Sequence, residues 1–128
     1  MEQYPMLTIP RVVSIEDDFD NFKLIQLTLQ PLAIELYHAA NGNEALKMTD
    51  QLAPDLVLLD LALPDANGWE LLKQIRERTD RLKGVIVLSV RLPIPSSKMA
   101  QEQVDACFGK PFMPSELRNT VRSLLSLA

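Results

Sequence analysis

The sequence predicts an α/β fold in which helices cover both faces of a single doubly wound, parallel five-stranded sheet. Short runs rich in Val, Ile and Leu alternate with longer stretches whose apolar residues recur every three or four positions, which is typical of strands joined by crossover helices. Two of the runs, Leu56 to Leu59 and Val85 to Leu88, contain no polar residue. Such runs indicate strands that are buried on both faces.

Length and composition are those of one folded domain without special features. The chain has 128 residues, of which 47% are hydrophobic and 23% charged, and this is enough for a proper core. The net charge of -4 leaves no basic cluster for phosphate backbones, so we expect no direct contact with nucleic acid. The one cysteine, Cys107, excludes an intramolecular disulfide and favours the cytoplasm. No apolar run approaches the length of a membrane span.

The expected strands follow from the apolar runs and from the turn residues that bound them. They lie at residues 11–15, 33–38, 55–60, 84–89 and 104–108. The first ends at three consecutive acids, and the second carries Glu35 and His38, which places it at an edge of the sheet. Pro54 precedes the third, which stops at Asp60, and Gly84 opens the fourth. Residues 1–10 are expected to form a flexible arm because Pro5 and Pro10 interrupt regular structure.

The expected helices follow from helical periodicity and from capping residues. They lie at residues 20–30, 43–51, 68–78, 96–103 and from 114 onward. Pro31 ends the first helix, and Asn41 and Ser96 are candidate caps of the second and fourth. Pro114 suits the first position of the last helix. The folded domain is therefore expected over residues 11–128, with no effector domain after it.

Polar residues stand where the apolar runs end. In a parallel sheet with the strand order 2-1-3-4-5, the first and third strands are neighbours, and the chain reverses direction between them. Ligands of open α/β sheets bind at such a point, outside the carboxyl ends of the strands. The side chains expected to converge there are Glu16, Asp17, Asp60, Ser89 and Lys110.

This set of residues is suited to phosphoryl capture. Three clustered carboxylates repel one another, and an oxygen-only site of this kind suits Mg²⁺, which keeps several of its waters. A carboxylate at the centre, Asp60, can act as a nucleophile and form an aspartyl-phosphate. Lys110 can pair with the phosphoryl oxygens, and Ser89 can donate a hydrogen bond to one of them. A site that only bound Mg²⁺ would need neither of these two residues.

From Arg11 to Leu127 the chain resembles the receiver domain of two-component response regulators. The motifs that carry the resemblance are Glu16-Asp17-Asp18, Asp60 within Leu-Leu-Asp-Leu-Ala-Leu-Pro-Asp-Ala-Asn-Gly, Ser89 after Val-Ile-Val-Leu, and Lys110-Pro111-Phe112. The resemblance implies a flavodoxin-like strand order and phosphorylation of Asp60 by a sensor histidine kinase or a phosphotransfer protein. It implies Mg²⁺ as cofactor, held by Glu16, Asp17, Asp60 and the backbone carbonyl of Ala62. It also implies Ser89 as the switch hydroxyl, Lys110 as the phosphoryl partner, and often a cis bond before Pro111.

Two positions depart from the family pattern. Cys107 stands three residues before the lysine, where receivers usually carry Tyr or Phe, and Val90 follows the switch hydroxyl, where the residue is usually small. Prolines also interrupt residues 91–95, before the fourth helix. We therefore expect the acceptor chemistry to be intact and the usual coupling of phosphorylation to the fourth helix and fifth strand to be weakened.

Three functions remain open at this point. The first is a stand-alone response regulator that signals through protein contacts or a phosphorelay, and whose only chemistry is phosphoryl acceptance and slow hydrolysis. The second is a receiver-like interaction module that works without phosphorylation. The third, a phosphohydrolase of the haloacid-dehalogenase type, is disfavoured because its general acid would stand at position 62, which is alanine. The sequence identifies neither the cognate kinase nor the output partner.

Overall fold

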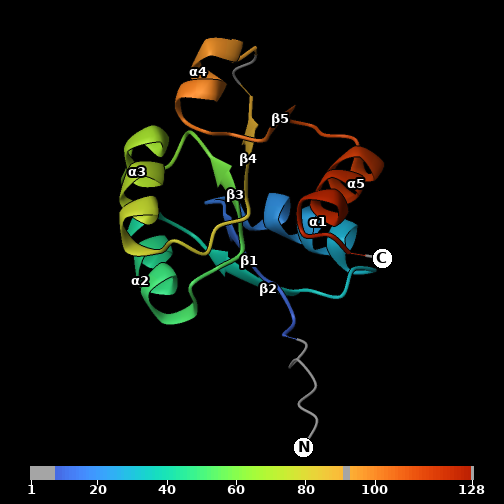
Figure 1. Ribbon diagram of the computed structural model, residues 1–128. Coiled ribbons are helices and arrows are strands. Elements are labelled where there is room, and N and C mark those ends of the chain that lie inside the picture. Colours follow the sequence, from blue (N-terminus) through green and yellow to red (C-terminus); the bar gives the residue numbers. More distant parts are fainter. Residues whose placement is uncertain (1–7, 91–92, 128) are drawn as a thin grey trace, which may run out of the picture.

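The computed structural model describes residues 8–90 and 93–127 and places them in one three-layered α/β unit (Figure 1). Residues 8–10 have no regular secondary structure, whereas residues 1–7 of the expected arm lie outside the described residues. The same holds for residues 91 and 92 of the proline-interrupted segment. Within the part of the chain that the structure describes, no helix combines the length and the apolar character needed to cross a bilayer.

Strands and helices alternate along the whole described chain. The elements are β1 (Arg11–Ile15), α1 (Phe19–Leu29), β2 (Glu35–Ala39), α2 (Gly42–Leu52), β3 (Leu56–Asp60), α3 (Gly68–Arg78), β4 (Gly84–Ser89), α4 (Ser96–Gln101), β5 (Ala106–Gly109) and α5 (Pro114–Leu124). All neighbouring strands pair in parallel, in the order β2-β1-β3-β4-β5. The predicted fold class and strand order are confirmed.

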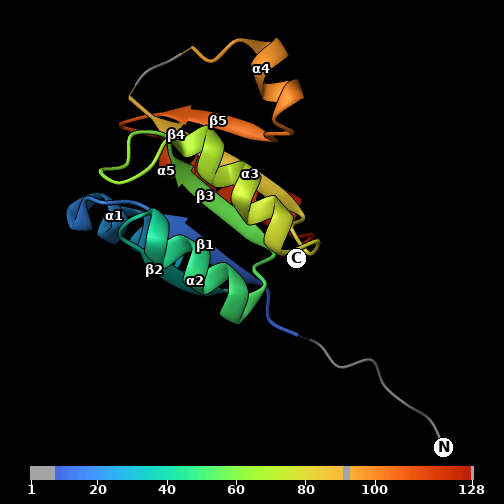
Figure 2. The ribbon, with the colours of Figure 1, turned by 90° about the vertical axis from the view of Figure 1, so that its left-hand side faces the viewer.

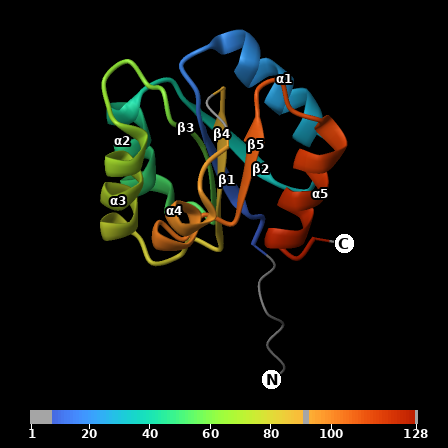
Figure 3. The same cartoon turned by 90° about the horizontal axis from the view of Figure 1, so that it is seen from above.

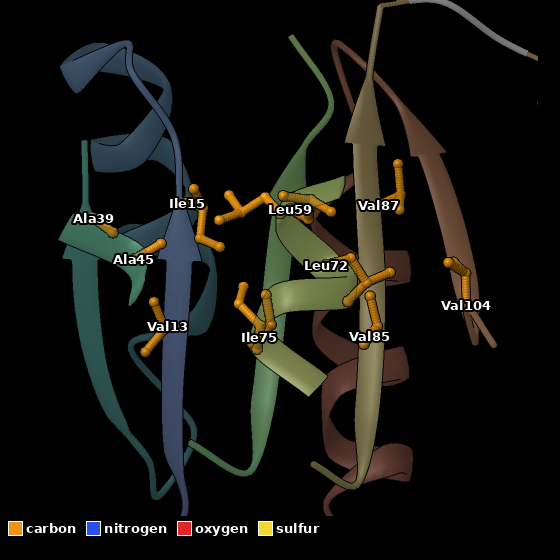
Figure 4. Packing of buried hydrophobic residues seen from close by; sticks show 12 residues of the cluster. Val13, Ile15, Ala39, Ala45, Leu59, Leu72, Ile75, Val85, Val87 and Val104 are labelled. Atoms are coloured by element: carbon orange, nitrogen blue, oxygen red, sulfur yellow. The ribbon is translucent and has the colours of Figure 1, made fainter. Parts of the chain in front are cut away.

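Helices cover both faces of the sheet, as Figure 3 shows from above: α1 and α5 lie on one side, and α2 and α3 on the other. Alternate residues of the central strands point to opposite faces, which gives two separate apolar cores. Val57 and Leu59 pack with α2 and α3, while Leu56 and Leu58 pack with α1 and α5. Figure 4 shows the first of these cores, with Leu72 and other α3 side chains against the sheet.

The predicted boundaries need correction near the two edge strands. β2 begins at Glu35 and not at residue 33, although its edge position is as expected. α4 ends at Gln101 and not at residue 103, because Gln103 takes a left-handed backbone conformation with φ of 55°. β5 accordingly begins only at Ala106.

The helix caps show which local signals were reliable. Asn41 caps α2 as predicted, and its side chain accepts a hydrogen bond from the Glu44 N–H at 2.9 Å. Pro114 occupies the first turn of α5, also as predicted. The capping prediction for Ser96 is wrong, since Pro95 is the capping residue and no side chain makes a cap hydrogen bond there. Figure 2 shows α4 next to β5 at the end of the sheet.

The central strand should dominate stability. Leu59 on β3 is fully buried, so Leu59→Ala removes buried apolar contacts and leaves a cavity, and we expect it to lower the free energy of unfolding by about 3 kcal/mol. Leu27 on α1 is 65% exposed, and Leu27→Ala should change it by less than about 0.5 kcal/mol. Urea unfolding followed by circular dichroism measures both, and similar losses in the two variants would contradict the assignment of the core.

Candidate functional site

The carboxyl ends of the strands meet at one edge of the sheet, where Figure 1 shows β1, β3 and β4 ending near one another. Glu16 and Asp17 directly follow β1, Asp60 is the last residue of the adjacent β3, and Lys110 directly follows β5. One carboxylate oxygen from each of the three acids lies within 4.8 Å of the others. The structure therefore brings together the acids that the sequence analysis placed at this edge.

Lys110 joins two of these acids. Its Nζ donates to Glu16 Oε2 at 2.6 Å and to Asp60 Oδ2 at 3.0 Å. All three side chains are largely buried, with side-chain exposures of 14% for Lys110, 2% for Glu16 and 8% for Asp60. The peptide bond between Lys110 and Pro111 is cis, as the family resemblance implied.

Backbone N–H groups satisfy the remaining oxygens of the two buried acids. Asp60 Oδ1 accepts a hydrogen bond from the Ala62 N–H at 3.0 Å, and Glu16 Oε1 accepts one from the Asp18 N–H at 3.2 Å. Each buried carboxylate is thus held by one ammonium contact and one amide contact. Such charge-assisted bonds are roughly twice as strong as neutral ones, so both carboxylates have a fixed orientation.

Burial and like charge act together on the protonation of the site. Burial raises the pKa of Glu16, and the nearby Asp60 charge raises it further, while the hydrogen bond and charge of Lys110 offset part of the rise. For Lys110, burial favours the neutral amine, but the hydrogen bonds and charges of Glu16 and Asp60 outweigh it and raise its pKa. Lys110 therefore stays charged between the two acids.

The donor set fits a hard divalent cation. Glu16, Asp17 and Asp60 offer oxygen ligands only. Among the described residues, the Lys110 ammonium is the one cation paired with this cluster, and a single positive charge does not neutralise three carboxylates. Asp17 is exposed while the other two acids are buried, so the cluster opens toward solvent on one side. A partly hydrated Mg²⁺ requires such an opening, because it dehydrates reluctantly and keeps several waters.

The other predicted site residues lie around this cluster. Ser89 is the last residue of β4 and is 2% exposed, and its carbonyl accepts a hydrogen bond from the Lys110 N–H at 3.1 Å. Ala62 is exposed and forms a bridge with Asn67 in the loop after β3. Val90 is 70% exposed and lines a cavity of about 310 Å³ together with Lys110 and residues of α1.

Cys107 stands at the position where receivers usually carry an aromatic residue. It is half-buried on the edge strand β5 and packs against the core on the α2 and α3 side. Burial raises the pKa of its thiol. An edge strand has only one neighbouring strand, and this leaves the position partly open.

Sequence reasoning assigned no role to His38, which the structure places beside the acidic pair. Its Nε2 lies 2.6 Å from the backbone oxygen of Glu16, and its ring stacks on Phe22 with centroids 4.1 Å apart. The register of the sheet pairs His38 with Ser14, two residues before Glu16. To predict this contact from the sequence, one would have had to know the register in which the first two strands pair.

Comparison with known proteins identifies the family to which this fold and site belong. Residues 12–122 match the family model of the response regulator receiver domain. The chain belongs to this family. Receiver domains are signalling modules of two-component systems and not enzymes in the usual sense.

Similar proteins differ in length. The chain is 28% identical over 117 residues to the polar-differentiation response regulator DivK of Brucella anthropi, covering 89% of this chain and 94% of that protein. It is 27% identical over 121 residues to the sporulation initiation phosphotransferase F of Bacillus subtilis, covering 91% and 94%. It is also 27% identical over 125 residues to the alkaline phosphatase synthesis transcriptional regulatory protein PhoP of that species. That alignment covers 90% of this chain but only 48% of the relative. The chain thus spans about half the length of several curated relatives that it matches.

Solved structures agree on the fold. The receiver domain of the Francisella response regulator 1452 superimposes with a TM-score of 0.79 at 28% identity, covering 91% of this chain and 97% of that one. The signal receiver domain of a putative Luxo repressor protein from Vibrio parahaemolyticus reaches a TM-score of 0.86 at 23% identity, covering 93% and 92%.

The Lys110 contacts should matter for stability as well as for chemistry. Lys110→Met leaves Glu16 and Asp60 buried without their ammonium, and we expect the metal-free protein to lose about 3 kcal/mol in the free energy of unfolding. Arg78→Met removes the exposed ion pair with Asp50 and should cost less than about 1 kcal/mol. Chemical unfolding in EDTA measures both variants. Equal losses would mean that Lys110 is no more than a surface cation.

Proposed function

We propose that this receiver accepts a phosphoryl group on Asp60 from a phosphohistidine of a sensor histidine kinase or a phosphotransfer protein, in the presence of Mg²⁺. The observation that carries the proposal is the double contact of Lys110 with Asp60 and Glu16 at the carboxyl ends of the strands. The single cysteine supports a reducing, cytoplasmic setting for this function.

In the proposed reaction an oxygen of Asp60 attacks phosphorus as the bond to the donor imidazole nitrogen breaks, and the imidazole leaves with the electron pair. Glu16, Asp17, Asp60 and the carbonyl of Ala62 would hold Mg²⁺, which neutralises charge on the phosphoryl oxygens when bound. Lys110 would pair with a phosphoryl oxygen as a point charge. The N–H of Ala62 orients the Asp60 carboxylate throughout.

Names of relatives support phosphotransfer or protein contact as the output. Two relatives of matching length are named a phosphotransferase and a polar-differentiation response regulator. By analogy, we propose that the present chain signals by passing on its phosphoryl group or by binding a protein partner.

A second candidate function is recognition of a partner without phosphorylation, and contacts of α4 favour it. The Arg76 guanidinium of α3 donates to the carbonyl of Gln103 at 2.8 Å and to that of Glu102 at 3.3 Å. Lys98 of α4 lies over the ring of Trp69, with Nζ 5.1 Å from the centroid. α4 is thus attached to α3 through its last turn and the two residues that follow it, without a contact to Asp60.

The first test is phosphorylation with acetyl phosphate. We expect intact-mass spectrometry to detect one added phosphoryl group on the wild type with Mg²⁺ and none in EDTA. Asp60→Asn should abolish labelling, because the amide is a poor nucleophile. Asp65→Asn is the matched control: Asp65 lies in the loop that follows Asp60 and accepts hydrogen bonds from the N–H groups of Gly42 and Asn43, so this variant should label normally. Labelling of Asp60→Asn would refute the assignment.

The second test concerns α4. A phosphoryl group shifts a conformational equilibrium only through its different affinity for the two states, and Cys107 is too small to act as the usual aromatic lever. We expect beryllofluoride and Mg²⁺ to move amide resonances near Asp60 and Lys110, and to move those of residues 96–108 much less. Arg76→Leu, which removes the hydrogen bonds from α3 to the residues after α4, should enlarge the changes in α4. Large wild-type shifts across residues 96–108 would show that the usual switch operates.

A further inference from the structure

His38 lies on β2, on the face of the sheet that α1 covers. Alternation along the strand places it on the same side as Leu36, which packs against the core formed with α1 and α5. The imidazole reaches from there to the turn that follows β1, and its Nε2 lies 2.6 Å from the backbone oxygen of Glu16. The only histidine of the chain thus contacts the backbone of the acidic pair.

The chemistry of the two groups fixes the direction of this hydrogen bond. A carbonyl oxygen only accepts, so Nε2 must carry a proton and donate. The N–H of Glu16 donates in turn to the carbonyl of Ala39 at 2.9 Å. Both backbone polar groups of Glu16 are therefore bonded to neighbouring residues of β2, one through the main chain and one through the His38 side chain.

The imidazole itself is held in place by aromatic packing. The buried Phe22 of α1 stacks on it with an interplanar angle of 11°, and Phe19 lies at a tilt with its centroid 6.3 Å away. A ring fixed by stacking loses little freedom when it forms its hydrogen bond, which makes the contact with Glu16 a stable constraint and not a transient one.

We propose that His38 is a positioning residue that fixes the Glu16–Asp17 turn in the geometry required for Mg²⁺, an inference that rests on the proposed function. Asp17 is exposed, so the direction of its carboxylate depends on the backbone on either side. On one side His38 holds the Glu16 carbonyl. On the other, Asp18 caps α1 and accepts a hydrogen bond from the Asp20 N–H at 2.9 Å.

Two substitutions separate the hydrogen bond from the packing. His38→Phe keeps a ring to stack on Phe22 but has no donor, whereas His38→Gln places an amide N–H near the position of Nε2 and lacks the ring. Groups that orient metal ligands from outside typically contribute tenfold or more to metal affinity. By calorimetry we expect His38→Phe to bind Mg²⁺ about tenfold more weakly than the wild type, and His38→Gln to recover most of the loss. Tyr37→Phe, on the opposite face of the same strand, is the matched control and should bind normally.

Metal-free NMR gives a readout that does not depend on Mg²⁺. In EDTA, the neutral imidazole of His38 should carry its proton on Nε2, and His38→Phe should shift the Asp17 amide resonance while His38→Gln leaves it near the wild-type position. A proton on Nδ1 instead, an unmoved Asp17 amide in His38→Phe, or unchanged Mg²⁺ affinity in that variant would each overturn the inference. Equal loss of affinity in both His38 variants would also overturn it, since packing and not the hydrogen bond would then be responsible. A wild type that binds no Mg²⁺ would refute the proposed function, and the metal-free spectra would still decide whether His38 positions the turn.

Discussion

The ammonium of Lys110, placed between Glu16 and Asp60, is the interaction on which the site depends. Two carboxylates from neighbouring strands lie buried at the same edge of the sheet, and burial alone would make both costly to ionise. Lys110 is charged and contacts both, so each buried carboxylate has a cationic partner and is held in a fixed position. A nucleophilic carboxylate needs this combination of burial and charge.

The fold provides this arrangement without any specialised loop. β1, β3 and β4 are almost wholly buried and pack against helices on both faces, which fixes the backbone up to the last residue of each strand. Charged groups then begin directly where the strands end. The central position of β3 puts Asp60 between residues contributed by strands on either side. The buried strands hold the acids in place. The exposed side chain of Asp17 leaves the site open for a cation to enter.

The sequence was sufficient for the fold and for the members of the acidic cluster, because both follow from where apolar runs stop. Asp60 and Lys110 could be predicted since each directly follows or ends such a run. Features that depend on side-to-side register could not be predicted in this way. His38 reaches Glu16 only because β2 and β1 align Ser14 with His38, and nothing in either segment alone specifies that alignment. The Ser96 cap failed for a related reason: a short helix with no buried residue is set by its contacts with α3, including the Arg76 bonds, more than by its own first residue.

A crystal structure of the protein with Mg²⁺ and beryllofluoride would show directly whether Asp60 is the phosphoryl acceptor, because it would locate the phosphoryl mimic among three candidate acids. We expect beryllium bonded to a carboxylate oxygen of Asp60, Lys110 Nζ in contact with a fluorine, and the metal beside Asp17. Attachment of beryllofluoride to another acid would contradict the assignment of Asp60. So would the absence of bound beryllofluoride, with Lys110 still bonded to both Glu16 and Asp60.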